Sequence, residues 1–379
     1  MDDLLNFPSD ILFDILSRIP IKSIVILRCV SKPWLDKLTD SFVMNCRKKR
    51  PKLLSRYIPD VSYQARSKHI TEGFMVSSVD YGESHKAVEV NSTMPDIHSY
   101  TGDFEAWNSC DGLLCLTYCK EFQRKVLCLW NPTTGDYMEF PTRDHCPYSS
   151  LCCGHKTVFS VGFNPNVNSY FAIRIETHSL TCHAPCSHVY IFYLAYRSWW
   201  HALEICYKIP PKQGALVNGA LHWLGASCTG TSYDLVIAFV IKGRKFQEVP
   251  LPYFGDMRTF SMDITELGGE LCLFCDFKSS VTLWLMKDYS VKESWTKMFS
   301  IKKPIGEFHT RNLLIPLCFT TSGALILIKV RTLVLYDPKD GKLVSLKIEG
   351  IPGRSQAFTT YIESPVRIKS SSQIFDYYT

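Results

Sequence analysis

The sequence predicts a mainly β-strand protein that begins with a short helical segment. In the first 45 residues apolar side chains recur at helical spacing, whereas beyond residue 55 short runs of β-forming residues alternate with Gly, Pro, Asn and Asp. These later runs also repeat along the chain. Of the 379 residues, 46% are hydrophobic and 21% are charged, so the composition is that of a folded protein. Disordered and fibrous classes are excluded.

Three helices are expected at the N-terminus. The first has its apolar residues three and four positions apart and ends at Pro20. Ser23 and Ser31 stand where the N-caps of the second and third helices would be. Three short helices in about 40 residues are too few to make a self-sufficient core. We therefore expect part of their apolar surface to bind a partner.

The region beyond residue 55 repeats one pattern of strands. Segments 129–136 and 335–342 share an aromatic residue, an Asx-Pro turn and a Gly at identical offsets. Several strands per unit and a period near 50 residues are typical of β-propeller blades. We predict a propeller of about six degenerate blades, with an irregular β-sandwich as the alternative. The expected aromatic anchors of five blades are Trp130, Phe192, Phe239, Trp284 and Tyr336.

Turn glycines open the inner strands of most of these blades. They occur in Asp111-Gly112, Asn218-Gly219, Gly268-Gly269 and Ser322-Gly323. A sixth blade can be built from residues 55–105 and closed by a C-terminal strand at 359–362. We expect the Trp residues of the repeats to lie in blade cores rather than to form a ligand cage.

Two groups of motifs resemble a known plant family. Segments 6–12, 15–23 and 28–34 closely resemble the F-box, with Phe7 where that family usually has Leu. Later motifs resemble the type 1 F-box-associated, kelch-like domain: 110–113, 130–134, 218–223, 292–297 and 360–365. The resemblance implies a kelch-like β-propeller preceded by a small three-helix F-box. Its expected boundaries are 1–45 for the F-box, 46–55 for a basic linker and 56–379 for the propeller.

The resemblance implies a substrate-recognition subunit of an SCF-type ubiquitin ligase that performs no catalysis itself. The F-box docks a Skp-type adaptor, and through it cullin and RING subunits, while the propeller holds an unidentified target for degradation. The alternative is a binding or sequestering protein that uses the adaptor without ubiquitin transfer. The resemblance carries the following adaptor-binding positions, for each of which internal packing is the alternative: Phe7, Pro8, Ile11, Leu12, Ile15, Leu16, Ile19, Pro20, Leu27, Cys29, Val30 and Trp34. We assign Pro8 and Trp34 to the interface.

Substrate binding is expected on loops between strands, because loops on a rigid scaffold can vary without unfolding it. Ordinary surface is the alternative for each loop, and the family resemblance does not choose between secreted ribonucleases, immune receptors and other targets. The candidate loops are Arg143–Lys156, Thr177–His188, Pro252–Phe260 and Lys303–Arg311.

Sixteen cysteines raise the question of disulfides and metals. The N-terminus lacks the basic and apolar regions of a signal peptide, so we interpret the cysteines mainly as small buried residues of a reducing compartment. Cys272 and Cys275 have the spacing of a redox motif, but alternation along a strand sends them to opposite faces. Two loops carry zinc-type donors, although neither has a second matching pair, and we expect no metal and no cofactor. Their donors are His145, Cys146, Cys152, Cys153 and His155, and His178, Cys182, His183, Cys186 and His188.

Other function classes find little support in the sequence. The net charge of +6 is spread: residues 1–50 hold nine Lys and Arg against six Asp and Glu, and the remainder 33 against 30. This spread argues against a nucleic-acid partner. The longest apolar run, 235–241, is too short for a membrane span, and no hydrolase, phosphate-loop or dinucleotide motif occurs. We expect a cytoplasmic or nuclear protein, in which Arg47–Lys52 is a candidate nuclear-import signal or a solvated linker.

Overall fold

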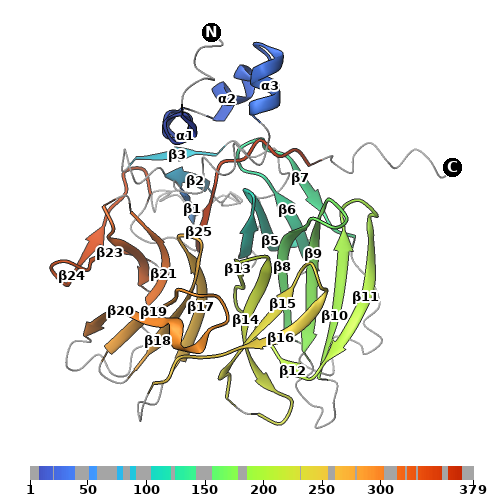
Figure 1. Cartoon of the computed structure of the whole chain (residues 1–379), viewed down its shortest axis with the longest axis vertical. Coiled ribbons are helices and arrows are strands. Elements are labelled where there is room, and N and C mark those ends of the chain that lie inside the picture. The colour runs from blue at the N-terminus through green and yellow to red at the C-terminus, as the bar shows by residue number, and fades with distance from the viewer. Residues whose placement is uncertain are drawn as a thin grey trace, which may run out of the picture. The chain divides into compact units, whose positions relative to one another are not determined.

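The structure is a computed structural model in two compact units. Residues 1–105, 111–140 and 347–379 form unit 1, and residues 106–110 and 141–346 form unit 2. Figure 1 shows the helices and strands of both units. The structure describes residues 8–19, 21–38, 51–57, 75–79, 86–90, 104–120, 124–141, 156–177, 186–230, 232–254, 261–277, 280–302, 314–320, 322–329, 332–351 and 357–368.

Three short helices form the N-terminal segment, as the sequence predicts. They are α1 (Ser9–Arg18), α2 (Ile21–Leu27) and α3 (Lys32–Lys37). Their apolar residues meet in a small core with Ile19 and Leu27 packed at its edge; its buried members are Leu12, Leu16, Ile21, Ile24, Trp34 and Leu38. An exposed ion pair of 2.9 Å joins Arg18 to Asp14 one turn earlier on α1.

The remainder forms six antiparallel sheets, which are the blades of a six-bladed β-propeller. One sheet of unit 1 has the strand order β25 (Ala357–Tyr361), β1 (Lys52–Tyr57), β2 (Met75–Val79) and β3 (Ala87–Glu89). A second sheet follows the order β4 (Phe104–Cys110), β5 (Leu113–Lys120), β6 (Arg124–Trp130) and β7 (Tyr137–Glu139). The mainly β prediction is confirmed, and a two-sheet sandwich is excluded.

Unit 2 holds the other four sheets, which are consecutive along the chain (Figure 1). The first contains β8 (Lys156–Asn164), β9 (Ser169–Thr177), β10 (Ser187–Tyr193) and β11 (Ser198–Ile205). The second contains β12 (Tyr207–Lys208), β13 (Ala215–Val217), β14 (Ala220–Ser227), β15 (Leu235–Val240) and β16 (Lys245–Val249). The third contains β17 (Ser261–Leu267), β18 (Glu270–Asp276), β19 (Ser280–Met286) and β20 (Trp295–Lys302), after the 3-10 turn η4 (Lys292–Ser294). The fourth contains β21 (Leu314–Phe319), β22 (Leu325–Lys329), β23 (Thr332–Asp337) and β24 (Lys342–Leu346).

The C-terminal strand completes the sheet that contains the first strand. β25 pairs antiparallel with β1, so that Leu54 lies opposite Thr359. This pairing confirms the expected sixth blade and its closing strand. β1 begins at Lys52, which is three residues before the expected end of the linker at residue 55. The three-part domain division otherwise stays a prediction.

The aromatic anchors mark one repeated position on the next-to-last strand of five blades. Four of them pair with the first or second residue of the last strand, as Trp130 does with Tyr137 and Phe239 with Phe246. In the sheet β17–β20 this position belongs to Met286, which pairs with Trp295 and is buried. The assignment of Trp284 as an anchor was wrong by two residues, because an aromatic pattern cannot distinguish two side chains on the same face.

Left-handed turns join the inner strands where the sequence predicts them. Asn218 and Gly219 have φ of 49° and 69°, and Gly268 and Gly269 have φ of 68° and 93°. Two successive residues with positive φ match the right-handed twist of the strands that they connect, which favours Asn-Gly and Gly-Gly. The turn glycines are therefore explained by hairpin geometry.

Candidate functional site

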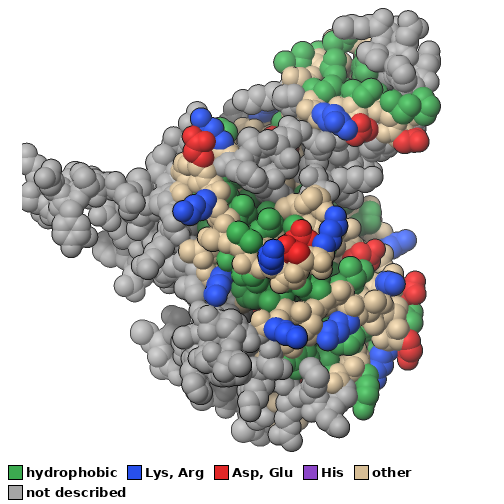
Figure 2. All heavy atoms as spheres, turned by 90° about the vertical axis from the view of Figure 1, so that its left-hand side faces the viewer, with side chains coloured by type: hydrophobic (Ala, Val, Ile, Leu, Met, Phe, Trp, Pro, Cys, Tyr) green, Lys and Arg blue, Asp and Glu red, His purple; other side chains and the backbone are tan. Residues whose placement is uncertain are grey.

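The N-terminal helices carry an apolar surface that their own core leaves open. Pro8, Ile11 and Ile15 are exposed on or beside α1, and Cys29 and Val30 are exposed in the turn after α2. Ile11 and Val30 each keep 47% of their surface accessible to solvent. Figure 2 shows hydrophobic side chains at the surface of this helical segment, at the top of the view. We call these five residues the apolar patch.

Two further apolar residues are exposed on the same helices. Ile26 of α2 is 65% exposed and Leu35 of α3 is 49% exposed. Neither was among the expected docking residues, because those positions follow the family motif, which does not show which side chains lie outside the buried stripe. Isoleucine and leucine at such exposure are individually unremarkable, but their number on so small a domain is what a partner surface requires.

The other expected docking residues lie beneath the patch or outside the described residues. Leu12, Leu16 and Trp34 are buried in the core, and Ile19 and Leu27 pack against it. Trp34 is only 3% exposed, which contradicts its assignment to the interface. A side chain of that size fills the centre of a core in which few other residues are available. Phe7 and Pro20 lie outside the described residues.

The motif after β6 has a structural role that the sequence did not reveal. Asn131 is fully buried, and its Nδ2 donates to the carbonyl oxygens of Ser364 at 3.1 Å and Val366 at 2.8 Å. Its Oδ1 accepts from the backbone N–H of Thr133 at 2.9 Å. Asp136 in the same turn accepts from the N–H of Ile368. The turn motif therefore holds the tail motif that the same family resemblance includes.

Two tryptophans make the same hydrogen bond in different blades. The indole N–H of Trp199 on β11 donates to the carbonyl of Pro141 at 3.0 Å, and that of Trp295 on β20 donates to Pro250 at 2.7 Å. Each proline follows the outer strand that comes earlier in the chain, β7 or β16. Trp295 is also buried, as expected of a blade-core residue, whereas Trp199 is only half-buried.

A buried histidine links two neighbouring blades of unit 2. His222 on β14 places Nδ1 3.2 Å from the carbonyl of Ala215, and Nε2 2.7 Å from the hydroxyl of Tyr289. Burial lowers the pKa of His222 to about 4, although its hydrogen bonds to the carbonyls of Ala215 and Ala220 act in the opposite direction. A neutral ring with its proton on Nδ1 satisfies both partners, because Nε2 then accepts from the tyrosine.

Most described cysteines are core residues, as expected. Those at the five positions predicted in or beside strands are all buried: Cys110, Cys115, Cys128, Cys272 and Cys318. Cys272 and Cys275 belong to different core clusters, which confirms that alternation separates them. Burial raises the pKa of the Cys275 thiol to about 12, and that of Cys272 also rises. Neither thiol is therefore an accessible redox nucleophile.

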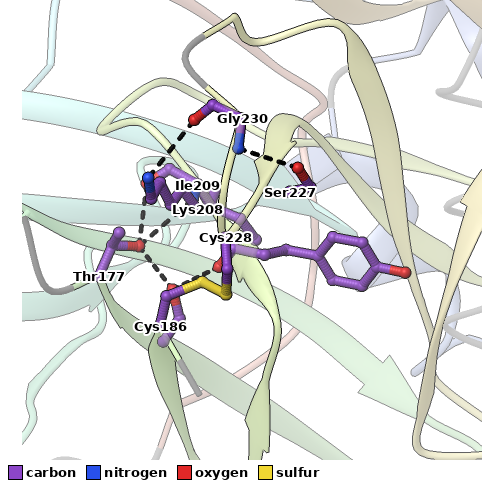
Figure 3. Close-up of a disulfide and its surroundings, with 9 residues drawn as sticks. Thr177, Cys186, Lys208, Ile209, Ser227, Cys228 and Gly230 are labelled. Atoms are coloured by element: carbon purple, nitrogen blue, oxygen red, sulfur yellow. Dashed lines mark hydrogen bonds between the residues drawn. A yellow bond between two sulfur atoms is a disulfide. The ribbon is translucent and has the colours of Figure 1, made fainter. Parts of the chain in front are cut away.

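One pair of cysteines departs from that expectation. Cys186, just before β10, forms a disulfide with Cys228, just after β14, across a sequence separation of 42 residues. Figure 3 shows the bond beside Thr177, whose hydroxyl lies 2.8 Å from that of Ser187. The general interpretation of the cysteines as unpaired buried residues does not hold for these two, because the ends of strands in different sheets meet only after folding. Cys186, one of the zinc-type donors named above with His178, Cys182 and His183, is therefore not available to a metal.

The expected substrate loops fall largely outside the described residues. Residues 142–155, 178–185, 255–260 and 303–313 lie outside the described residues. They include His145, Cys146, Cys152, Cys153, His155, His178, Cys182 and His183. The structure does place the strands that these loops connect: β7 to β8, β9 to β10, β16 to β17 and β20 to β21. Among the described helices, none has the length and hydrophobicity of a membrane span.

A small helical domain with an open apolar patch, joined in sequence to a six-bladed propeller, defines a two-domain β-propeller protein. Residues 4–42 match the model of the F-box domain, and residues 62–375 match that of the F-box associated beta propeller domain. The chain therefore belongs to the F-box proteins with an F-box-associated propeller. The resemblance drawn from the motifs is confirmed for the F-box and for an F-box associated propeller, whereas the matching model is not specific to the type 1 domain.

Relatives that match most of this chain are found in Arabidopsis thaliana. The chain is 27% identical to F-box protein At3g07870, over 92% of this chain and 88% of the relative. It is 25% identical to F-box protein CPR1, over 93% of this chain and 87% of the relative. Among solved structures, a chain of the nidogen/laminin complex matches with a TM-score of 0.43 and 8% identity, over 83% of this chain and 99% of that one. That structural match is too weak to bear on function.

Proposed function

We propose that the protein is the substrate receptor of an SCF-type ubiquitin ligase. Residues 1–45 act as the docking domain for a Skp-type adaptor, which connects the chain to cullin and RING subunits. The propeller, residues 56–379, binds the target protein. The observation that carries the proposal is the apolar patch, which a domain belonging to the F-box family leaves open to solvent.

The patch has the chemistry of a helix-binding protein interface. Pro8, Ile11 and Ile15 are spaced three and four residues apart, so they lie on one side of α1, next to the buried stripe of Leu12 and Leu16. An adaptor that covers the exposed side chains of Pro8, Ile11 and Ile15 gains apolar burial without disturbing the core beneath them. Of the twelve expected docking residues, we assign the five of the apolar patch to direct contact and Leu12, Leu16 and Trp34 to support.

The proposed mechanism is proximity rather than bond chemistry. Holding a target lysine near a ubiquitin thioester raises its effective concentration, so transfer becomes a local event. In this proposal the chain supplies two binding surfaces, and the bond chemistry belongs to the partners of the complex. The target is bound by propeller loops, because loops can vary without disturbing the blades.

Adaptor binding tests the proposal directly. Ile11→Glu combined with Ile15→Glu places two charges in the patch, and we expect adaptor affinity to fall about 30-fold or more, as for an interface hot spot. Isothermal titration of the full chain with a recombinant Skp-type adaptor measures this. Asp10→Lys is the matched control, because Asp10 is exposed on the other side of α1. Unchanged affinity in the double variant would reject this docking surface.

Target turnover distinguishes ubiquitin transfer from sequestration. The full-length Ile11→Glu, Ile15→Glu chain serves as bait for proximity labelling in cells, because a receptor that does not dock retains its targets. We expect captured proteins to become longer-lived in cells that express this variant than in cells that express the unaltered chain. Equal half-lives would support an adaptor-bound binding protein without ubiquitin transfer.

A further inference from the structure

One face of the sheet β8–β11 brings together three side chains of the types that ligate metal ions. His188 lies on β10, and His201 and Glu204 lie on β11. One ligand atom from each of the three residues lies within 4.8 Å of the others. His188 Nδ1 is 3.2 Å from Glu204 Oε1. Ligand atoms of one tetrahedral zinc ion stand about 3.3 Å apart, so small rotations of the two imidazoles complete the set.

A β-bulge is what places all three residues on the same face. His188 pairs with Glu204 and Tyr190 pairs with His201, so the fourth strand carries one extra residue, Ala202, between the two pairs. In a regular strand, residues three positions apart point to opposite faces. The bulge therefore aims His201 and Glu204 in the same direction.

We propose that His188, His201 and Glu204 form a binding site for a zinc-class divalent cation. Two imidazoles and one carboxylate suit Zn²⁺, and the partial exposure of the site leaves its remaining position open to water or to a donor from a bound protein. On the neighbouring strand β9, Glu176 lies opposite His188 and Arg174 lies opposite Tyr190. These two groups form an ion pair with each other, so the guanidinium charge beside the site is compensated.

The sheet β17–β20 shows that the shared scaffold alone does not make this site. It has the same bulge at the equivalent place, with Thr282 paired with Ser300 and Trp284 paired with Lys297. Thr282, Ser300 and Lys297 thus take the positions of His188, Glu204 and His201. The donor set is a property of the sheet β8–β11. It goes beyond the proposed ligase function and does not depend on it.

Zinc titration of the full chain tests the site. Tag-free protein is stripped with a chelator, freed of it, and titrated with Zn²⁺ by calorimetry. We expect His201→Gln and Glu204→Gln to remove one equivalent of bound zinc, or to weaken one binding event about tenfold or more. Lys297→Gln, at the equivalent place in the other sheet, is the matched control and leaves binding unchanged. Mg²⁺ binds none of these proteins at this position, because imidazole is a poor ligand for it.

X-ray absorption separates this site from the cysteine-containing loops. We expect the zinc equivalent that is lost in His201→Gln to show nitrogen and oxygen neighbours, including imidazole, and no sulfur. Identical zinc stoichiometry and affinity in unaltered and His201→Gln chains would overturn the proposal. A sulfur-bound ion that persists in both variants, with no other equivalent, would overturn it equally. Circular dichroism confirms that the variants are folded.

Discussion

The sheets β8–β11 and β17–β20 are two copies of one architecture with different chemistry. Both have a bulge in the fourth strand, and in both a tryptophan of that strand donates to a proline carbonyl. Yet the first copy carries imidazoles where the second carries Thr282 and Lys297. Backbone features that define a blade are thus repeated, whereas the side chains on the exposed part of its face are free to differ.

The two copies also differ in how they attach to the sheet between them. The sheet β12–β16 is joined to β8–β11 by the Cys186–Cys228 disulfide, and to β17–β20 by the His222–Tyr289 hydrogen bond. We expect the first joint to respond to redox conditions and the second to pH. Four experiments compare the two sheets and their joints, beginning with the largest expected effect.

Reduction of the disulfide is expected to have the largest effect on stability. Closing a loop of 42 residues stabilises the folded state by about 4 kcal/mol in the chain-entropy account. We expect a reducing agent to lower the free energy of unfolding by that order, measured by urea denaturation. The double variant Cys186→Ala, Cys228→Ala is the control and should not respond. If it responds as strongly as the unaltered chain, the effect belongs to other cysteines.

Truncation of the two tryptophans should affect the two copies unequally. Trp295 is buried, whereas Trp199 is half-buried. We expect Trp295→Ala to cost about 3 kcal/mol and Trp199→Ala about half as much, since the smaller loss of apolar contact leaves less of a cavity. Urea denaturation measures both. Equal costs would mean that the shared hydrogen bond, and not burial, dominates.

Acidification should weaken the joint that contains His222. The pKa of His222 is about 4 in the folded state against an ordinary value of 6.5. At pH values between the two, His222 therefore binds a proton in the unfolded chain but not in the folded chain. This contribution is fully present above pH 6.5. We expect it to fall by about 2 kcal/mol between pH 7 and pH 5. His222→Gln should lose this part of the pH dependence in urea denaturation, and an unchanged pH profile would contradict the assignment.

The smallest effect concerns the indole hydrogen bonds alone. Replacing either tryptophan by phenylalanine removes the N–H donor but keeps an aromatic ring. We expect Trp199→Phe and Trp295→Phe each to cost about 1 kcal/mol, because a carbonyl acceptor loses its partner in both. Thermal unfolding, compared between the two variants, measures the difference. A much larger cost for Trp295→Phe would show that ring shape contributes there as well.

The sequence supported the fold further than it supported the sites. Turn pairs such as Asn218-Gly219 are local signals, and the anchors Trp130 and Phe239 recur at a period that the structure confirms. The helical stripe of α1 likewise predicted its buried residues. Such patterns are readable because each depends on a few neighbouring residues.

Contacts between distant segments were not readable in this way. Cys186 and Cys228 meet at the ends of strands in different sheets, and His201 joins His188 only through a bulge that no local pattern marks. Trp34 was assigned to a surface because its motif was known, but burial depends on the volume that three helices must fill. Which distant residues meet therefore depends on strand register and side-chain direction, which residue spacing alone does not determine.

The pairing of β25 with β1 has a consequence for synthesis. The blade that begins first along the chain is finished last, because its edge waits for residues 357–361 while some 300 others are translated. Until then β1 offers an unpaired strand edge, which is a template for wrong partners. A ribosome that stops early leaves this edge open. Once β25 is in place, β1 is paired on both sides and has no free edge for another chain.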